Sequence, residues 1–370
     1  MPANRWKGIG AMTGTSMDGL DLACCTFERT ENRYVFSIDV AESLPLEGGW
    51  RDQFMHLYEA DAETYAHIHV AWGAWLGQQM AAFIRRNGLN PHFAAMHGQT
   101  IFHQPGRGFT SQIGDGEAAV AFLPCPLVSN FRVKDVVLGG QGAPLVPLGE
   151  KFLFPDRRLF LNLGGFSNLS FGGSAFDVAP CNIVLNALYR RHLPADPLGY
   201  DDRGALAASG QLLPDLLTAL DNLPFYTQLP PKSLGWEWVE QQCMPVLERF
   251  DAPLADLLHT VVLHIARQIA AGLSLTGARN EALLVTGGGR HHHFLMEEIA
   301  RACAPLGIAP DYTAPDAWTD YKEAIIFAFL GLRCLEGETT TLASVTGAPQ
   351  DAVTGAIHLP PGGGWRVVRV

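Results

Sequence analysis

The segment GAMTGTSMDGLDLACC, at residues 10–25, places glycines, hydroxyl side chains and two aspartates between two apolar runs. The backbone N–H groups and hydroxyls of such a turn can converge on one anion, and glycine lets that anion approach the backbone closely. Asp18 or Asp21 could also hold a hydrated magnesium ion. The segment lacks the GxxxxGK[ST] pattern of a P-loop, and glycine and aspartate are ordinary turn residues. A phosphate-binding turn and a plain hairpin turn therefore both remain open.

Two further glycine-rich turns follow apolar strands in the second half of the chain. The segment NLGGFSNL (162–169) places Gly164 and Gly165 between two strands, and VTGGGRHHHFL (285–295) places three glycines between a buried strand and a helix. A glycine turn at the start of a helix can bring backbone amides and the helix N-terminus against an anion. Such turns also occur without any ligand, but three of them together favour a nucleotide-binding protein.

Single polar residues also follow apolar strands. Asp177 ends the strand in AFDVAPCN, where a carboxylate beside a cleft can act as a general base or can cap a turn. His97 and Gln99 in MHGQT, and Arg132 in NFRVKD, mark either a site or a polar surface loop. The three histidines at 291–293 suggest a metal site, but neighbouring helix residues point about 100° apart and no Cys, Asp or Glu pattern completes it. We expect a solvated helix start there.

The elements that must position these residues occur in two similar series. The first begins with three predicted strands joined by tight turns, in KGIGAMT, LDLACCTFE and YVFSIDVAESL. A long amphipathic helix follows, because apolar residues recur every three to four positions, Asp61 can cap its start and Gly88 can end it. FAAMHGQT then predicts a short buried strand.

From about residue 156 the order restarts with three predicted strands, in RRLFLNLGG, FSNLSF and SAFDVAP, followed by a helix in CNIVLNALYRRH. An apolar helix over roughly 254–275, the strand, turn and helix around 285–295, and a last helix in YKEAIIFAFLGLRCL complete the pattern. It predicts a duplicated α/β architecture, with QGAPLVPLGEKFLFPD as the connection between the halves.

Composition limits the functional classes. At 370 residues the chain has room for two domains, and 48% apolar with 17% charged residues is typical of a globular protein. The formal net charge is −11 and no long basic stretch occurs, which argues against nucleic acid or an anionic membrane as a partner. Seven cysteines without a CxxC pair indicate reduced thiols, and neither a signal peptide nor about 18 uninterrupted apolar residues occur. We therefore expect a cytoplasmic protein.

The chain resembles the anhydro-N-acetylmuramic acid kinases along most of its length. Ten segments match that family in order: MTGTSMDGLD, HGQTIFHQP, QIGDGEA, NFRVKDVVLGGQGAPLVP, NLGGFSNL, FDVAPCN, LPPKS, TGGGRHHHFL, EAIIFAFLGLR and ASVTGA. Any one of these segments is weak evidence, but ten collinear matches are specific to the family.

The resemblance implies membership of the sugar kinase, actin and heat-shock chaperone ATPase superfamily. The implied fold class is α/β, with two ribonuclease-H-like (actin-like ATPase) domains at residues 1–132 and 133–370 and a nucleotide cleft between them. Family enzymes hydrolyse the 1,6-anhydro bond of 1,6-anhydro-N-acetylmuramic acid and phosphorylate its O6 with MgATP. The product is N-acetylmuramic acid 6-phosphate, formed during peptidoglycan recycling. The resemblance thus implies ATP, Mg²⁺ and an anhydrosugar as partners, and leaves a homodimer open.

The resemblance also implies roles for single residues. Asp177 matches the catalytic aspartate, which would take a proton from the water that attacks the anomeric carbon. Asp18 would hold magnesium through water. Positions near the sugar are matched by His97, Gln99, Arg132 and Glu323. The implied nucleotide-binding residues are Gly14, Thr15, Ser16, Met17, Asp18, Gly19, Leu20, Asp21, Gly164, Gly165, Gly287, Gly288 and Gly289.

Two segments depart from the family pattern. After the aspartate the family has Thr-Gly-Pro-Gly-Asn, whereas this chain has VAPCN (178–182), and a later family aspartate is Asn186. In LPPKSLGWEW, Leu234 and Trp236 replace polar family residues. The added Cβ atoms in VAPCN could crowd the phosphates or the sugar. Two alternatives follow: a kinase of another anhydrosugar without the lactyl group, such as levoglucosan, and a nucleotide-binding sensor that has lost the transfer step.

Overall fold

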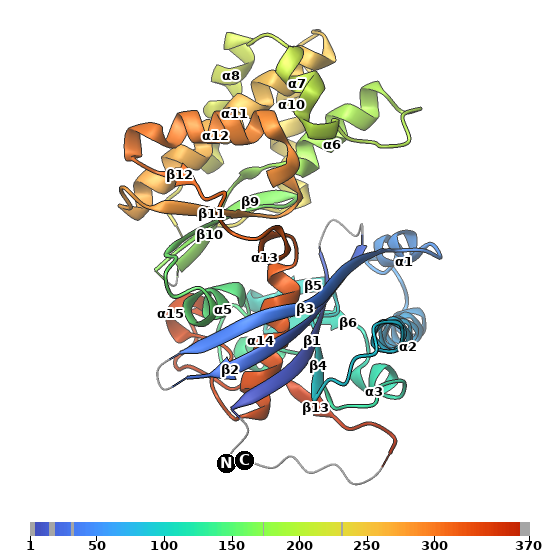
Figure 1. Ribbon diagram of the computed structural model, residues 1–370. Helices are drawn as coiled ribbons and strands as arrows, with labels where there is room; N and C mark the ends of the chain where they lie inside the picture. The colour runs from blue at the N-terminus through green and yellow to red at the C-terminus, as the bar shows by residue number, and fades with distance from the viewer. Residues whose placement is uncertain (1–3, 15–18, 31–32, 173, 231, 363–370) are drawn as a thin grey trace. The chain divides into compact units, whose positions relative to one another are not determined.

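The computed structural model describes residues 4–14, 19–30, 33–172, 174–230 and 232–362 of the chain (Figure 1). The predicted site residues Thr15, Ser16, Met17 and Asp18 lie outside these ranges. The chain forms two compact units. The first contains residues 1–155 and 321–370, and the second contains the continuous segment 156–320.

The first unit is built around a six-stranded sheet. Its strands are β1 (Arg5–Thr13), β2 (Gly19–Arg29), β3 (Tyr34–Pro45), β4 (Phe93–Met96), β7 (Leu127–Ser129) and β13 (Ala356–His358). The order is β13-β7-β4-β1-β2-β3, in which β1, β2 and β3 form the predicted antiparallel meander. β4 runs parallel to β1, and β7 runs parallel to β4. A separate hairpin pairs β5 (Gln99–Gln104) with β6 (Phe109–Ile113).

The predicted amphipathic helix is α2 (Ala62–Arg86). Asp61 accepts a hydrogen bond from the Thr64 N–H at its start, and Gly88 follows its end with φ +59°. The apolar face of α2 is buried, and its Trp72 packs in one core with Ile9 of β1. The prediction from apolar periodicity is therefore confirmed.

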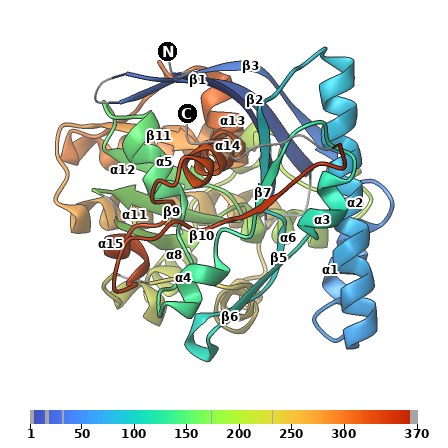
Figure 2. The ribbon, with the colours of Figure 1, turned by 90° about the horizontal axis from the view of Figure 1, so that it is seen from below.

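The opposite face of this sheet is covered by α14 (Lys322–Leu335), as Figure 2 shows. Neighbouring residues of a strand face opposite sides, so Gly10 of β1 faces α14 whereas Ile9 faces α2. A Cβ at Gly10 would lie 1.8 Å from the Ala324 carbonyl oxygen, so glycine is required for this close approach. The other helices of the unit are α1 (Trp50–His56), α3 (Gly116–Val120), α4 (Val133–Val137), α5 (Val146–Leu153) and α15 (Ala343–Thr346).

The second unit repeats this sheet order. Its strands are β8 (Leu159–Leu163), β9 (Phe166–Phe171), β10 (Ser174–Pro180), β11 (Ala282–Thr286) and β12 (Ala309–Pro310). They follow the order β10-β9-β8-β11-β12, with an antiparallel meander of β8, β9 and β10 and parallel pairing of β11 with β8 and β12. A register shift between Asp177 and Ala179 marks a β-bulge in β10.

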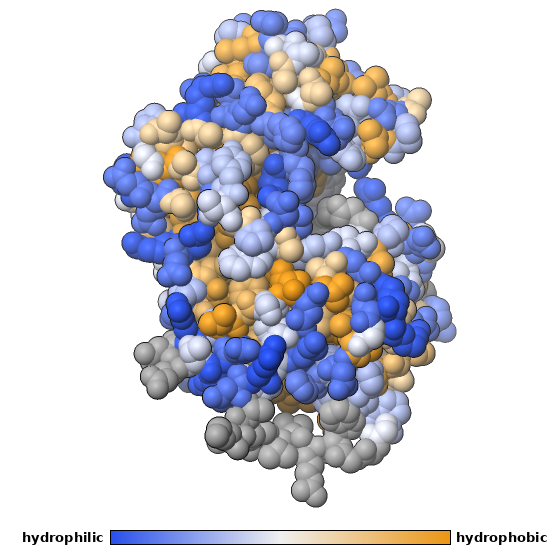
Figure 3. Space-filling model, in the orientation of Figure 1, coloured by the Kyte–Doolittle hydropathy of each residue, from blue (hydrophilic) through white to orange (hydrophobic). Residues whose placement is uncertain are grey.

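The helix α11 (Leu254–Thr276) runs through the core of the second unit. By length and composition it could cross a membrane, but 61% of its most apolar window is buried inside the protein. Figure 3 shows polar and apolar residues interspersed over one face of the molecule. The other helices of the unit are α6 (Asn182–His192), α7 (Ala205–Ser209), α8 (Pro214–Asp221), α9 (Trp236–Trp238), α10 (Met244–Leu247), α12 (His293–Cys303) and α13 (Asp316–Asp320).

The shared strand order confirms the predicted fold class, α/β with two repeated ribonuclease-H-like halves. The division between the compact units differs from the predicted boundary at residue 132. Residues 133–155 belong to the first unit because α5 packs against α14 and β3, and residues 321–370 belong there because α14 covers β1, β2 and β4. A boundary drawn in sequence could not include a helix that returns from the far end of the chain.

Candidate functional site

Polar side chains of the first unit gather where its parallel strands end. His97 directly follows β4, and Arg132 follows β7 by three residues. The carboxyl ends of parallel strands meet at one edge of a sheet, which is where open α/β sheets bind ligands. The Arg132 Nε–H donates to His97 Nε2 at 2.9 Å, so this edge brings the two predicted residues together.

The hydrogen bonds of His97 define its charge state. His97 Nδ1 lies 2.8 Å from the Gly98 carbonyl oxygen and must donate to it, while Nε2 accepts from Arg132. The ring is therefore neutral with its proton on Nδ1. Burial and the neighbouring Arg132 hold the pKa of His97 well below its ordinary value. Both ring nitrogens are used inside the protein, so His97 supports Arg132.

Arg132 is held from a second side by a glycine-rich loop. Its NH1 donates to the Gly142 carbonyl at 2.7 Å. The buried Asp135 accepts the Gly142 N–H at 2.7 Å and the Thr346 hydroxyl at 2.9 Å, which fixes the loop. Burial lowers the pKa of Arg132 to about 10, so it stays cationic at neutral pH. Sequence reasoning missed Asp135 and Gly142, although the segment GGQGAPLVP carried a signal.

Glu323 lies in the first turn of α14 and is brought to this edge by the close packing of Gly10 against Ala324. Burial raises the pKa of Glu323, whereas Lys322 and Arg132 oppose that rise. Lys322 itself forms a buried ion pair with Glu150, with 2.9 Å between Nζ and Oε1. Among the described residues, Glu323 accepts no hydrogen bond, which leaves its carboxylate available to a ligand.

Two other predicted site positions are close in sequence to residues of this edge. Gln99 lies two positions after His97, and Gly14 directly follows β1. Gln99 is 1% exposed, and its Oε1 has no hydrogen-bond partner among the described residues. Thr13 ends β1 and donates its hydroxyl to the Gly98 carbonyl at 3.0 Å. Gly14 follows Thr13, and Gly19, Leu20 and Asp21 are the first residues of β2. Asp21 Oδ1 accepts from the Ser43 hydroxyl at 2.5 Å.

Asp177 lies in the second unit, at the bulge of β10. Burial raises the pKa of its carboxyl to about 6, partly offset by the Leu234 N–H, which donates to Oδ2 at 2.8 Å. The Asp177 N–H donates to the Lys232 carbonyl at 3.0 Å. Within the described part of the chain, the second oxygen, Oδ1, has no hydrogen-bond partner. A half-held carboxylate that titrates near neutral pH can serve as a general base.

The glycines of the second unit fall into two groups. Gly287 has φ +85° and ψ 163°, and a Cβ there would lie 2.8 Å from the Leu163 carbonyl oxygen, so the fold itself requires glycine. Gly289 is likewise needed, because its Cβ would lie 2.7 Å from the Leu163 Cβ. At Gly164, Gly165 and Gly288 the space a Cβ would take has no atom closer than 3.4 Å, and φ is unexceptional. At these three positions neither φ nor the surrounding atoms require glycine.

The end of β11 differs from the expected strand, glycine turn and helix. A 3₁₀ turn (Gly288–His291) intervenes, and His292 caps α12 by accepting the Leu295 N–H at 3.1 Å. The expected solvated histidines are therefore only partly correct, because His291 and His293 are exposed but His292 is buried. Gly204, which has no Cβ, leaves room for the imidazole ring of His292. No group of three or more His, Cys, Asp or Glu in the described ranges could hold a metal.

The residues that depart from the family pattern after Asp177 lie in the core. Val178, Ala179 and Cys181 are at most 2% exposed and belong to the hydrophobic core of the second unit. The N–H groups of Cys181 and Asn182 donate to the Gly165 and Gly164 carbonyls, which ties the β8–β9 turn to the start of α6. The added Cβ atoms at 179 and 181 therefore do not line the open side of the turn.

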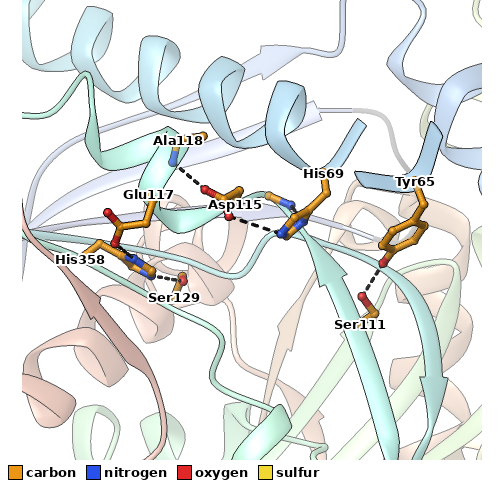
Figure 4. A network of polar contacts seen from close by, with 9 residues as sticks. Tyr65, His69, Ser111, Asp115, Glu117, Ala118, Ser129 and His358 are labelled. Carbon is orange, nitrogen blue, oxygen red and sulfur yellow. Dashed lines mark hydrogen bonds and ion pairs between the residues drawn. The ribbon is translucent and has the colours of Figure 1, made fainter. Parts of the chain in front are cut away.

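Figure 4 shows a polar network elsewhere in the first unit. Ser129 Oγ lies 2.9 Å from His358 Nε2, and His358 Nδ1 lies 2.6 Å from Glu117 Oε1. This order of groups is that of a hydrolase triad. Ser129 is only 6% exposed, however, and its hydroxyl is not open to a substrate. The network instead joins β13 to β7 and α3, and Gly116 leaves room for the His358 ring.

Comparison with known proteins gives a consistent result. A model of the anhydro-N-acetylmuramic acid kinase family matches residues 6–360. An anhydro-N-acetylmuramic acid kinase of Pseudomonas fluorescens (strain Pf0-1) is 35% identical over 373 residues, covering 95% of this chain and 98% of that protein. The corresponding proteins of Pseudomonas putida and Acinetobacter baylyi are 36% and 31% identical, over 95% and 94% of this chain and 98% of each relative.

Solved structures are less similar. The ROK hexokinase of Thermus thermophilus has a TM-score of 0.36 and 16% identity, covering 88% of this chain and 99% of that one, which is too weak to support a conclusion. The family model, by contrast, matches from within β1 to beyond β13, the edge strand of the first sheet. This chain belongs to the anhydro-N-acetylmuramic acid kinase family.

Proposed function

We propose that this chain is an ATP-dependent kinase of 1,6-anhydro-N-acetylmuramic acid. It hydrolyses the 1,6-anhydro bond and phosphorylates O6, which gives N-acetylmuramic acid 6-phosphate in the recycling of peptidoglycan. The observation that carries the proposal is the family match over residues 6–360. The half-buried carboxylate of Asp177, with one oxygen held and the other without a hydrogen-bond partner among the described residues, supports it.

In the proposed mechanism, Asp177 takes a proton from water through Oδ1. The water oxygen bonds to the anomeric carbon, the bond from that carbon to O6 breaks, and its electron pair stays on O6. O6 then attacks the γ-phosphorus, and ADP leaves. A carboxyl whose pKa is about 6 is mostly ionised at neutral pH, yet it is a stronger base than an ordinary aspartate.

The sugar side of the proposal uses the residues gathered in the first unit. Arg132 carries a fixed positive charge and retains guanidinium N–H groups beyond those given to His97 and Gly142. Glu323 and the Gln99 amide oxygen supply acceptors that have no hydrogen-bond donor among the described residues. Such acceptors suit the hydroxyl and amide groups of an N-acetylated sugar. His97 acts through Arg132.

The nucleotide side uses the glycine turns. Gly164, Gly165 and Gly288 suit a phosphate chain, because the fold would accept a Cβ at each with only ordinary contacts and so does not itself require glycine. Gly287 and Gly289 shape the turn that presents Gly288. The segment from Gly14 to Asp21 would bind the outer phosphates, and Asp18 would hold Mg²⁺ through water. When bound, Mg²⁺ supplies charge neutralisation for the phosphates.

A coupled ADP-release assay tests the proposal. The purified chain is mixed with MgATP and one of three sugars: 1,6-anhydro-N-acetylmuramic acid, the same sugar without its lactyl group, or levoglucosan. We expect sugar-dependent ADP release with the first sugar, and mass spectrometry should detect both added water and added phosphate. ADP release with none of the three would sink the kinase assignment. Preference for a sugar without the lactyl group would change the substrate.

One observation favours that second substrate class. Leu234, whose N–H donates to Asp177, and Trp236 replace polar family residues, and Trp236 is 43% exposed. Exposed apolar side chains favour a sugar with fewer charged groups. The stretch VAPCN gives no support to a sensor that has lost catalysis, because Val178, Ala179 and Cys181 are buried in the core.

Location and assembly are parts of the same proposal. All seven cysteines are buried and free, which suits a reducing cytoplasm. A small-molecule substrate needs neither nucleic acid nor membrane. A homodimer is the assembly that we propose to test, by light scattering of the 40.2 kDa chain. A mass near twice that value supports it, and a mass near 40 kDa would contradict it.

A further inference from the structure

The segment 232–234, which lies outside both sheets, forms two hydrogen bonds with Asp177. The Asp177 N–H donates to the Lys232 carbonyl at 3.0 Å, and the Leu234 N–H donates to Asp177 Oδ2 at 2.8 Å. One bond fixes the backbone of Asp177 and the other fixes its side chain. The segment 232–234 therefore determines where this carboxylate lies.

The bulge of β10 fixes the same residue from within the sheet. Ser167 of β9 donates its hydroxyl to the Ala179 carbonyl at 3.0 Å and accepts the Ala179 N–H at 3.2 Å. These bonds bridge the register shift between Asp177 and Ala179. A bulge re-aims the side chain beside it, so the direction of the Asp177 side chain is set by backbone geometry.

The Lys232 side chain is anchored beside Phe176 and Val178 of β10. Its Nζ donates to the Phe225 carbonyl at 3.4 Å and lies 4.4 Å from the centre of the Phe225 ring. Lys232 also lines a cavity of about 20 Å³ with Phe176 and Val178, the residues on either side of Asp177. Lys232 therefore anchors the segment, and its charge is not among the groups that shift the pKa of Asp177.

No charged side chain among the described residues shifts the pKa of Asp177. Burial raises it to about 6, and the Leu234 N–H lowers it. β9 places the uncharged Asn168 opposite Asp177, and α11 contributes the uncharged Gln268 to the cavity behind β10. The Leu234 amide is thus the group that favours the ionised carboxyl.

We propose that the backbone N–H of Leu234 is a positioning group for proton transfer by Asp177. It holds Oδ2, so that Oδ1 is the oxygen that receives the proton, and it stabilises the ionised carboxyl. The inference rests on the proposed role of Asp177 as the base. It also explains why leucine is accepted at a position where the family has a polar residue, because the backbone amide is unchanged.

Two variants separate the amide from the side chain. Leu234→Pro removes the N–H, and Leu234→Ala is the matched control that keeps it. In the proline variant, the acid limb of the profile of kcat/KM against pH should move upward by about one pH unit, since a hydrogen bond to a charged group is worth roughly that shift. Turnover should recover at higher pH. The alanine variant should keep the wild-type limb.

A nuclear magnetic resonance titration keeps the test valid if the proline variant does not fold. Leu234 is one of three leucines that follow a serine, so ¹³C′-serine and ¹⁵N-leucine labelling leaves three amide signals. Because Asp177 accepts its N–H, the Leu234 signal should titrate with the pKa of the activity limb, near 6. In Asp177→Asn the titration should vanish.

The outcomes are distinguishable. A Leu234 amide that does not titrate between pH 5 and 8, or an acid limb shared by Leu234→Pro and the wild type, overturns the positioning role. Titration of the amide without sugar-dependent turnover leaves the contact intact and rejects the proposed function instead. Full activity of Asp177→Asn rejects the base on which the inference rests.

Discussion

The two units use one sheet order but treat their polar side chains differently. In the first unit, Arg132 is held by His97 and by the Gly142 carbonyl, and Asp135 accepts the Gly142 N–H, so hydrogen bonds within the unit fix the position of the guanidinium. In the second, one oxygen of Asp177 has no hydrogen-bond partner in the described part of the chain, and at three glycines the fold leaves room for a Cβ. We expect the first arrangement to hold the sugar with side chains that are fixed in place. We expect the second to leave room for the reacting atoms. A change to Arg132 should cost stability as well as activity, whereas a change to Asp177 or to Gly288 should cost activity alone.

The largest effect is expected at the open carboxylate. Asp177→Asn should lower turnover by roughly 10²–10⁴, the range for loss of a general base. Its melting temperature should not fall, because burial disfavours the ionised carboxyl. The folded-state pKa, about 6, is raised above the ordinary value of 3.8, so this group contributes stability at low pH and loses it as pH rises through 6. Turnover and thermal denaturation at pH 7 check both parts, and a destabilised variant would break the contrast.

Arg132→Met should damage both properties. It leaves His97 Nε2 and the Gly142 carbonyl without a donor, at a cost of about 1–3 kcal/mol in the free energy of unfolding. It also removes the cation beside Glu323, so KM for the sugar should rise at least tenfold. Chemical denaturation and steady-state kinetics measure the two effects. Arg132→Lys is the control. Its stability and its KM should lie between those of the wild type and Arg132→Met, since lysine keeps the positive charge but lacks the planar guanidinium donors. Weakened sugar binding with unchanged stability would argue against a rigid network.

The glycine turns allow a matched pair within the second unit. Gly288→Ala should leave the unfolding free energy within about 0.5 kcal/mol of the wild type and raise KM for ATP about tenfold. Gly287→Ala should destabilise the protein by about 1–3 kcal/mol, because its φ of +85° and ψ of 163° suit only glycine. Urea denaturation measures the free energy of unfolding of each variant, and initial rates at varied ATP concentration measure KM. Equal destabilisation by both changes would remove the distinction between ligand-facing and structural glycines.

The smallest effect over the physiological range concerns pH. Below about pH 6 the kcat/KM should fall tenfold per pH unit as Asp177 becomes protonated, while between pH 7 and 8 it should change little. His97 should add no limb near 6.5, since burial and Arg132 hold its pKa well below that value. A pH profile with Asp177→Asn beside the wild type tests the assignment. A limb that survives in the variant belongs to another group.

Local patterns in the sequence predicted the elements well. The periodicity of α2, its Asp61 cap and the two three-strand meanders all depend on residues close together in the chain. The short strands β7, β12 and β13 were not predicted from the sequence. Strands of so few residues show too little alternation of apolar and polar residues to detect. The return of α14 to the first unit depends on the fit of Gly10 against Ala324, a contact across more than 300 residues.

Sequence alone selected candidate site residues but not their arrangement. Residue identity and family resemblance selected Asp177, Arg132 and the glycines, whereas the support of Arg132 by His97 and Asp135 appears only in three dimensions. The glycines show the limit most clearly. Gly287 and Gly288 are neighbours of one type, yet only backbone angles and surrounding atoms reveal that the fold demands the first and leaves the second open.

The placement of α14 also orders events during synthesis. The second unit is one continuous segment, 156–320, so all of it can leave the ribosome and fold before α14 emerges. The first sheet is translated earliest but keeps one apolar face uncovered until residues 322–335 arrive. The unit translated first is therefore completed last, and a chain halted near residue 320 would carry a finished second unit beside a bare, aggregation-prone sheet.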